Sequence, residues 1–233
     1  MFNPATDLPK DSGNAALSCA ARPQTREAYM REQSDQHEVN GGLAGLEALI
    51  GRAGTGGGAA PVERWDPPHC GKLDIRIGRD GLWYYLGTPI GREPLVRLFA
   101  SVLRRDADGV TYLVTPVEKI EITVDDAPFL GVEMNATGTG GEQVLTVRTN
   151  VGDVVTVDGD HPMRFEPEAD TGGLKPYVLV RGRLDARLAR PLLYELVDYG
   201  TTEERDGTAW FGVWSSGLFF PMMRQAELER LSV

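Results

Sequence analysis

Short segments of alternating apolar and polar residues fill the chain from Trp65 onward. In the first of them, three apolar residues alternate with Asp74 and Arg76, and an Arg-Asp-Gly turn leads into an aromatic strand at residues 83–86. This pattern predicts a hairpin with one buried face. Further strands are expected at residues 112–117, 120–124, 129–134, 144–148 and 154–157. Strands this short and closely spaced indicate antiparallel sheet rather than βαβ units.

A series of elements occurs twice: an aromatic strand, a proline-started helix, an Asp-Gly turn and a second aromatic strand. In the first copy Tyr112 follows Pro94 by 18 positions, and in the second copy Trp210 follows Pro191 by 19. The matched spacing indicates an internal duplication, although strand, helix and strand also recur by chance. A groove between two similar halves is the default place for a ligand.

The start of the second helix has two interpretations, because an apolar stripe of four leucines, Leu184 to Leu196, continues across Pro191. Either Pro191 kinks one long helix, or it occupies the first turn of a new helix, where its missing N–H does no harm. With either start, the expected fold is α+β and mainly antiparallel sheet. It has two related halves, each with a strand-helix-strand unit.

Composition divides the chain into four expected segments. Residues 1–40 have few large apolar side chains and are predicted to form a mobile leader. Residues 41–60 are predicted to form a short amphipathic helix followed by a glycine-rich linker. The linker lacks the preceding strand and the Gly-Lys-Ser/Thr ending of a phosphate loop. The two repeats are placed at residues 61–135 and 136–233.

The overall charge narrows the classes of partner. With 24 Lys and Arg against 34 Asp and Glu, the net charge is −10, which disfavours non-specific binding to nucleic acid or to an anionic membrane. No apolar run approaches the ~18 residues of a membrane span. The two cysteines give neither a disulfide framework nor metal-ligand spacing, and both are expected to be thiols. The expected location is cytoplasmic.

Five cations are the candidate ligand-binding residues. Four are placed on strands, where guanidinium and ammonium groups form charge-assisted bonds to phosphate or carboxylate. The fifth lies near the expected helix start at Pro94, where backbone N–H groups favour an anion. An alternative interpretation is that these cations pair with acids of the chain itself, such as Asp74 or Glu118. The five candidates are Arg76, Arg92, Lys119, Arg148 and Arg181.

Catalytic and metal motifs do not stand out in the sequence. His161 follows Asp158 and Asp160, but an Asp-Gly-Asp sequence before a strand is ordinary turn chemistry. A metal site needs three or four ligands, and the chain has only three histidines. We therefore expect no catalytic residue, no metal, no cofactor and no enzymatic activity.

Several long segments resemble one bacterial protein family, domain of unknown function 1285. They include Trp65-Asp66-Pro67-Pro68-His69-Cys70-Gly71, Tyr112-Leu113-Val114-Thr115-Pro116-Val117-Glu118-Lys119 and His161-Pro162-Met163-Arg164-Phe165. The resemblance covers about residues 60–223. It implies a duplicated core, a carboxy-terminal half like pleckstrin-homology folds, a nucleotide-like ligand between the halves and a signalling role. It supplies no catalytic residue, because the family has no established activity.

The leading functional hypothesis is a binding module that holds a small anionic or nucleotide-like ligand between the two repeats. A second hypothesis is a protein interaction domain that uses the carboxy-terminal aromatic and methionine side chains, a cluster apolar enough for an interface core. A third is a hydrolase that uses His161 with Asp158 or Asp160. The members of the proposed protein-binding cluster are Trp214, Phe219, Phe220, Met222 and Met223.

Overall fold

The computed structural model describes residues 45, 47–48, 50–51, 59–168 and 173–231. The first half contains η1 (Val62–Arg64), β1 (His69–Ile77), β2 (Trp83–Tyr85), β3 (Thr88–Pro89), α3 (Glu93–Ser101), β4 (Leu103–Arg105), β5 (Thr111–Val114) and β6 (Lys119–Val124). The second contains β7 (Phe129–Thr137), η2 (Gly140–Glu142), β8 (Val144–Thr149), β9 (Val154–Thr156), β10 (Met163–Pro167), β11 (Leu174–Arg181), β12 (Leu184–Leu188), α4 (Arg190–Asp198), β13 (Thr201–Arg205), β14 (Thr208–Ser215), β15 (Leu218–Arg224) and α5 (Gln225–Leu231).

The amino-terminal predictions are covered only in part. The expected leader and the glycine run at residues 54–58 lie outside the described residues. The described residues between 45 and 51 are helical, as expected for this segment. Ile50 is fully buried in the core, so this helical segment packs against the rest of the protein.

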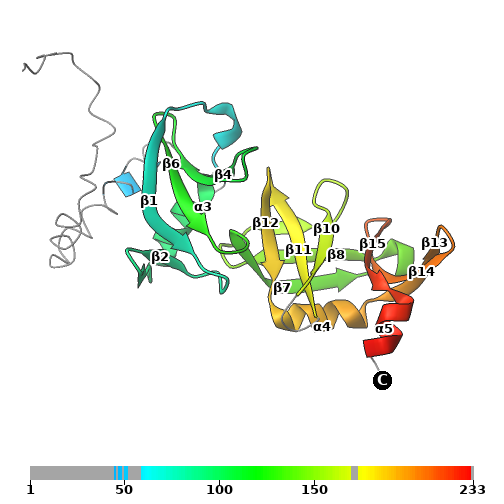
Figure 1. Ribbon diagram of the computed structural model, residues 1–233. Helices are drawn as coiled ribbons and strands as arrows, with labels where there is room; N and C mark the ends of the chain where they lie inside the picture. Colours follow the sequence, from blue (N-terminus) through cyan, green and yellow to red (C-terminus); the bar gives the residue numbers. More distant parts are fainter. Residues whose placement is uncertain (1–44, 46, 49, 52–58, 169–172, 232–233) are drawn as a thin grey trace, which may run out of the picture.

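The first half is one six-stranded sheet in the order β3-β2-β1-β6-β5-β4 (Figure 1). Strands β1 to β3 form one antiparallel unit, and strands β4 to β6 form another. Helix α3 connects the two units along the chain, and they join where β1 runs parallel to β6. The antiparallel units follow the predicted pattern, whereas the parallel join is a feature that the sequence pattern did not indicate.

Two aspartates shape hairpin turns of the first half in the same way. Asp80 accepts hydrogen bonds from the Leu82 backbone N–H at 3.0 Å and from the Tyr84 hydroxyl at 3.3 Å. Asp108 likewise accepts hydrogen bonds from the Val110 backbone N–H at 2.9 Å and from the Tyr112 hydroxyl at 3.1 Å. The glycine after each aspartate has a positive φ, 77° and 83°, which glycine adopts at no steric cost. The expected Asp-Gly turns are confirmed.

The second half has a six-stranded sheet in the order β10-β11-β12-β7-β8-β9 and a three-stranded sheet, β13-β14-β15. In the larger sheet β12 runs parallel to β7. The end of β14 is tied to β8 and β9 through Ser215, whose hydroxyl accepts from the Leu145 N–H at 2.9 Å and donates to the Val157 carbonyl at 2.6 Å. These bonds join the three-stranded sheet to the six-stranded sheet.

The order of elements repeats between the two halves. Three antiparallel strands, a helix and three more antiparallel strands occur as β1–β3, α3 and β4–β6, and again as β10–β12, α4 and β13–β15. The expected α+β class, mainly antiparallel and with two similar halves, is confirmed. The change from the first sheet to the second falls between Val124 and Phe129, so the division expected at residue 135 falls within β7.

The interpretation of Pro191 is settled by where α4 begins. This helix starts at Arg190, and Pro191 lies in its first turn. Leu184 and Leu188 belong instead to β12, where alternate residues are buried. The prediction of one long kinked helix is therefore wrong, and the new helix is confirmed. A four-residue spacing places side chains on one face of a strand as well as of a helix, which explains the ambiguity.

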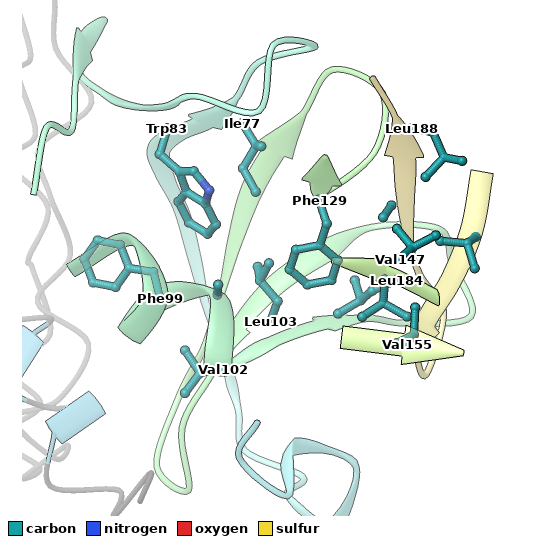
Figure 2. Packing of buried hydrophobic residues seen from close by; sticks show 14 of the residues in the cluster. Ile77, Trp83, Phe99, Val102, Leu103, Phe129, Val147, Val155, Leu184 and Leu188 are labelled. Atoms are coloured by element: carbon teal, nitrogen blue, oxygen red, sulfur yellow. The ribbon is translucent and has the colours of Figure 1, made fainter. Parts of the chain in front are cut away.

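Buried apolar side chains of both halves form one continuous cluster. Figure 2 shows Phe129 at its centre, between Leu103 of the first half and Leu184 and Val147 of the second. A side-chain bond also crosses the boundary, since Asn150 Nδ2 donates to the Gly81 carbonyl at 3.0 Å. The halves therefore share a core rather than meeting only at their surfaces.

Two findings bear on the expected location. Among the described helices, none has the length and apolar character needed to cross a membrane. Cys70 is disulfide-bonded, so the expectation of a thiol at this position is wrong. The cysteine chemistry therefore gives no support to the prediction of a cytoplasmic protein.

Candidate functional site

A groove of about 500 Å³ lies between the two halves. On the first half it is lined by α3, with Pro94, Arg97 and Leu98 among the lining residues. On the second half it is lined by the β8–β9 turn and by Arg181 of β11. Proline sets the start of α3, and the turn between paired strands places residues 151–153 opposite this helix.

Arg181 joins the two walls of the groove. Its Nη1 donates to Asp153 Oδ2 at 2.6 Å on the second half, and its Nη2 donates to the Ala100 carbonyl at 2.7 Å on the first. The guanidinium lies over the Phe129 ring, 4.8 Å from its centroid. Its Nε is buried, and none of the residues that the structure describes offers it a hydrogen-bond acceptor. A buried N–H without an acceptor carries a desolvation cost, which a ligand oxygen can offset.

The charged residues that line the groove have a net positive charge. Arg97 and Arg181 are the cations among the described lining residues, and Asp153 is the carboxylate. Asp153 is already paired with Arg181, while Arg97 makes a looser contact of 3.4 Å with Glu93 on the exposed face of α3. Sequence analysis missed Arg97 and Asp153. The one available signal for Arg97 was its position one helical turn after Pro94.

The other four predicted ligand-binding cations do not converge on this groove. Arg76 of β1 pairs with Asp125 at 2.6 Å and stacks on the Tyr84 ring. Arg92, just before α3, pairs with Glu47 at 2.9 Å, and Arg148 of β8 pairs with Glu133. The interpretation as internal ion pairs therefore describes these three residues, although their acids are not Asp74 or Glu118.

Lys119, the remaining candidate, belongs to a compact charge cluster in the first half. Its Nζ lies 2.9 Å from Asp106, which also accepts from Arg104 at 2.6 Å. Arg104 is buried and donates to the carbonyls of Val62 and Trp65, so the cluster holds the segment around η1 against the sheet. Burial alone would raise the pKa of Asp106, but the hydrogen bonds from Arg104 and Lys119 outweigh it and lower that pKa. Lys119 is therefore structural here.

The catalytic alternative places its groups in a turn. Asp158 accepts hydrogen bonds from the backbone N–H groups of Asp160 and His161, at 2.9 and 2.8 Å. The His161 ring is in turn 3.0 Å from the Leu179 carbonyl through Nδ1. These contacts are those of ordinary turn chemistry. Among the described residues, no three or more His, Cys, Asp and Glu side chains are grouped so as to hold a metal ion.

The aromatic cluster of the interaction hypothesis lies mostly inside the protein. Phe219, Phe220 and Met222 are buried, and Trp214 donates its indole N–H to Glu203 at 3.0 Å. Trp214 also stacks at a tilt against Phe219. Apolar side chains that fill the protein's own core are not available to a partner.

Glu118 gives a pH-dependent prediction. This residue is buried in the turn between β5 and β6, and burial raises the pKa of its carboxyl above the ordinary value of 4.5. Between pH 4.5 and the raised pKa of the folded state, Glu118 therefore binds more protons in the folded state than in the unfolded state. Through this pH range the contribution of Glu118 makes the stability of the protein fall as the pH rises. We expect Glu118→Gln to stabilise the protein at pH 7 and to lose that advantage below pH 4.5.

Urea unfolding of wild type and Glu118→Gln at several pH values measures this effect. Glu142→Gln is the matched control, because Glu142 is exposed. A constant difference between wild type and Glu118→Gln across the whole pH range would contradict a raised pKa in the folded state.

Comparison with known proteins gives consistent matches. The amino-terminal domain model of DUF1285, a domain of unknown function, matches residues 60–127, and the carboxy-terminal domain model matches residues 128–222. The crystal structure of a DUF1285 family protein from Silicibacter pomeroyi DSS-3 is 50% identical, with a TM-score of 0.71, covering 77% of this chain and 95% of its own. A family protein from Shewanella baltica OS155 is 29% identical, with a TM-score of 0.42, covering 54% and 91%. No curated protein matches. The chain belongs to the DUF1285 family.

Proposed function

We propose that this protein is a non-catalytic binding module that holds a small anionic ligand in the groove between its two halves, with Arg181 as the main contact. The single observation that carries the proposal is the incomplete bonding of this guanidinium. Arginine has five N–H donors, and the described partners of Arg181 take two of them. The buried Nε, at the boundary of the two halves, has no acceptor within the described part of the chain.

The size and charge of the groove support a ligand with one negative charge and an apolar body. A volume of about 500 Å³ is in the range of small-molecule sites. Pro94, Leu98 and Val151 supply apolar surface, and the two arginines and one aspartate of the lining carry a net charge of +1. A polyphosphate would meet too few cations here, and the chain's net charge of −10 would repel it.

The position of the groove also supports the signalling role. A ligand on Arg181 would contact α3 of the first half and the β8–β9 turn of the second at the same time. It would compete with Asp153 and with the Ala100 carbonyl for the same guanidinium. Ligand occupancy would thus be coupled to the packing of the two halves, which is the physical requirement for transmitting a binding event.

Thermal unfolding with millimolar benzoate, AMP or ATP tests the proposal. A ligand that binds only the folded state raises its stability by mass action, about 2.7 kcal/mol at 100 times Kd. We expect benzoate to raise the Tm more than AMP does, and ATP to have little effect. Arg97→Ala, at an exposed side chain, should weaken binding at least about tenfold, because one charge-assisted bond to a ligand is worth roughly 1.5–3 kcal/mol.

Arg148→Ala is the matched control, since Arg148 is also ion-paired but lies outside the groove. It should leave the ligand-induced shift in Tm unchanged. The absence of any shift at millimolar concentration would overturn the proposal. An equal loss in Arg97→Ala and Arg148→Ala would also overturn it, since it would indicate diffuse charge attraction.

A further inference from the structure

Asp153 is the carboxylate among the described residues that line the groove, and the backbone of its turn holds it there. Its N–H donates to the Thr149 hydroxyl at 3.0 Å, and its carbonyl accepts from the Thr149 N–H at 2.8 Å. The Gly152 N–H adds a bond of 3.0 Å to the carbonyl of Thr149, which is fully buried. The β8–β9 turn therefore fixes Asp153 at the wall of the groove.

The ion pair of Asp153 with Arg181 is partly shielded from solvent. The side chains of Asp153 and Arg181 are 32% and 22% exposed. Those of Glu133 and Arg148, which pair outside the groove, are 61% and 50% exposed. Water and salt screen partly buried charges less than exposed charges. Asp153 therefore acts more strongly on a charged group in the groove than a surface carboxylate would.

A ligand anion would share the guanidinium of Arg181 with Asp153. The Asp153 carboxylate accepts from Nη1, and the Ala100 carbonyl accepts from Nη2. The Nε–H is left for a ligand oxygen. Two negative groups would then face each other across the width of one guanidinium. Asp153 therefore lowers the affinity for an anion, and lowers it further with each additional negative charge on that anion.

The balance of charges in the lining has a consequence for specificity. Arg97 and Arg181 carry two positive charges and Asp153 carries one negative charge, which gives a net charge of +1. A monoanion neutralises this lining. A dianion leaves an uncompensated negative charge in a partly buried site, which costs free energy. With a neutral residue at position 153, the lining would instead match a dianion.

We propose that Asp153 is the specificity residue that selects ligands with a single negative charge and disfavours phosphate monoesters and other dianions. This inference rests on the proposed anion site at Arg181, and it names the class of ligand as a carboxylic acid with an apolar body. The selection is by charge rather than by size, because the space beside the turn is open. Apart from its chain neighbours, a Cβ on Gly152 would meet no atom of the described residues within 4 Å.

Benzoate and phenyl phosphate test this inference, because they share an aromatic body and differ in the charge of the head group. At pH 8 benzoate carries one negative charge and phenyl phosphate nearly two, since the second pKa of phosphate monoesters is about 6. Isothermal titration calorimetry with the full-length protein measures both dissociation constants. We expect the wild type to bind benzoate more tightly than phenyl phosphate.

Asp153→Asn removes the charge and keeps the size of the side chain. We expect benzoate to bind this variant about fivefold more tightly and phenyl phosphate about 25-fold more tightly, because the repulsion that is removed doubles with the charge of the ligand. Glu133→Gln is the matched control, since it changes the net charge of the chain equally but at an exposed ion pair outside the groove. It should leave both dissociation constants within about twofold of the wild type.

The two proposals about the groove fail in different ways. If the wild type and Asp153→Asn bind neither probe at millimolar concentration, the groove is not an anion site and both proposals are overturned. If the wild type binds benzoate but Asp153→Asn gains nothing, or gains equally for both probes, the anion site stands and the role of Asp153 is overturned. The same gain in Glu133→Gln would also overturn that role. A wild type that prefers phenyl phosphate would overturn it without any variant.

Discussion

Phe129→Ala is expected to lower the free energy of unfolding by about 3–5 kcal/mol, the range for removal of a large buried aromatic side chain. Phe129 is 1% exposed and belongs to the core cluster that both halves share. Figure 2 shows its ring between Leu103 of the first half and Leu184 of the second. Because the core is continuous, we expect both halves to lose stability together. The guanidinium of Arg181 also loses the ring over which it lies.

Urea unfolding followed by hydrogen exchange measures the loss in each half separately. Tyr194→Ala is the control, since Tyr194 is 59% exposed on α4 and surface changes of this kind usually stay within about 0.5 kcal/mol. A large loss of protection in the second half with none in the first would show that the halves are independent. That result would contradict the shared core.

Gly212→Ala is expected to destabilise the protein by about 1–3 kcal/mol, as for other overpacked sites. Gly212 of β14 pairs with Pro221 of β15 beside a β-bulge. A Cβ at this position would lie 2.9 Å from the Pro221 Cα and 2.7 Å from the Phe219 ring, and closer still to the Phe220 carbonyl. Two of these three neighbours are backbone atoms, so the strands must separate to admit a methyl group.

Gly91→Ala is the matched control for this change. A Cβ at Gly91 would meet no atom within 4 Å, and its backbone does not require a positive φ. Alanine there should be neutral or slightly stabilising, because it reduces the freedom of the unfolded chain. A Tm for Gly212→Ala equal to that of Gly91→Ala would contradict the close approach of β14 and β15.

Local structure was predictable from the sequence because its signals are local. The Asp80-Gly81 turn and the strands around it follow from turn residues and alternation within a few positions, and the structure has them. The parallel pairing of β1 with β6 was not predictable. It joins residues far apart in the sequence, such as Arg76 and Asp125, which are 49 positions apart. Pairing over this distance does not change the alternation of apolar and polar residues within either strand. Leu184 and Leu188 were ambiguous because their spacing fits both a helix and a strand.

The candidate site was predictable only in part. Pairing with acids of the chain itself was one of the two interpretations of the five candidate cations, and each of the five has such a partner. Sequence position could not show which of them faces the groove, because that depends on how the halves pack. Arg181 is held at the groove by its hydrogen bonds to Asp153, 28 positions away, and to the Ala100 carbonyl, 81 positions away. Long-range contacts of this kind have no local signature in the sequence.

The most direct test of the Arg181 groove is an NMR titration of the arginine Nε–H resonances with benzoate. The proposal predicts a saturable shift of the Arg181 Nε–H, because a ligand oxygen would become the acceptor that this buried group lacks. The Nε–H of Arg148, which already donates to Glu133 at 2.7 Å, should not move. An Arg181 resonance that stays fixed at millimolar benzoate, or that moves no more than that of Arg148, would contradict an anion site in the groove.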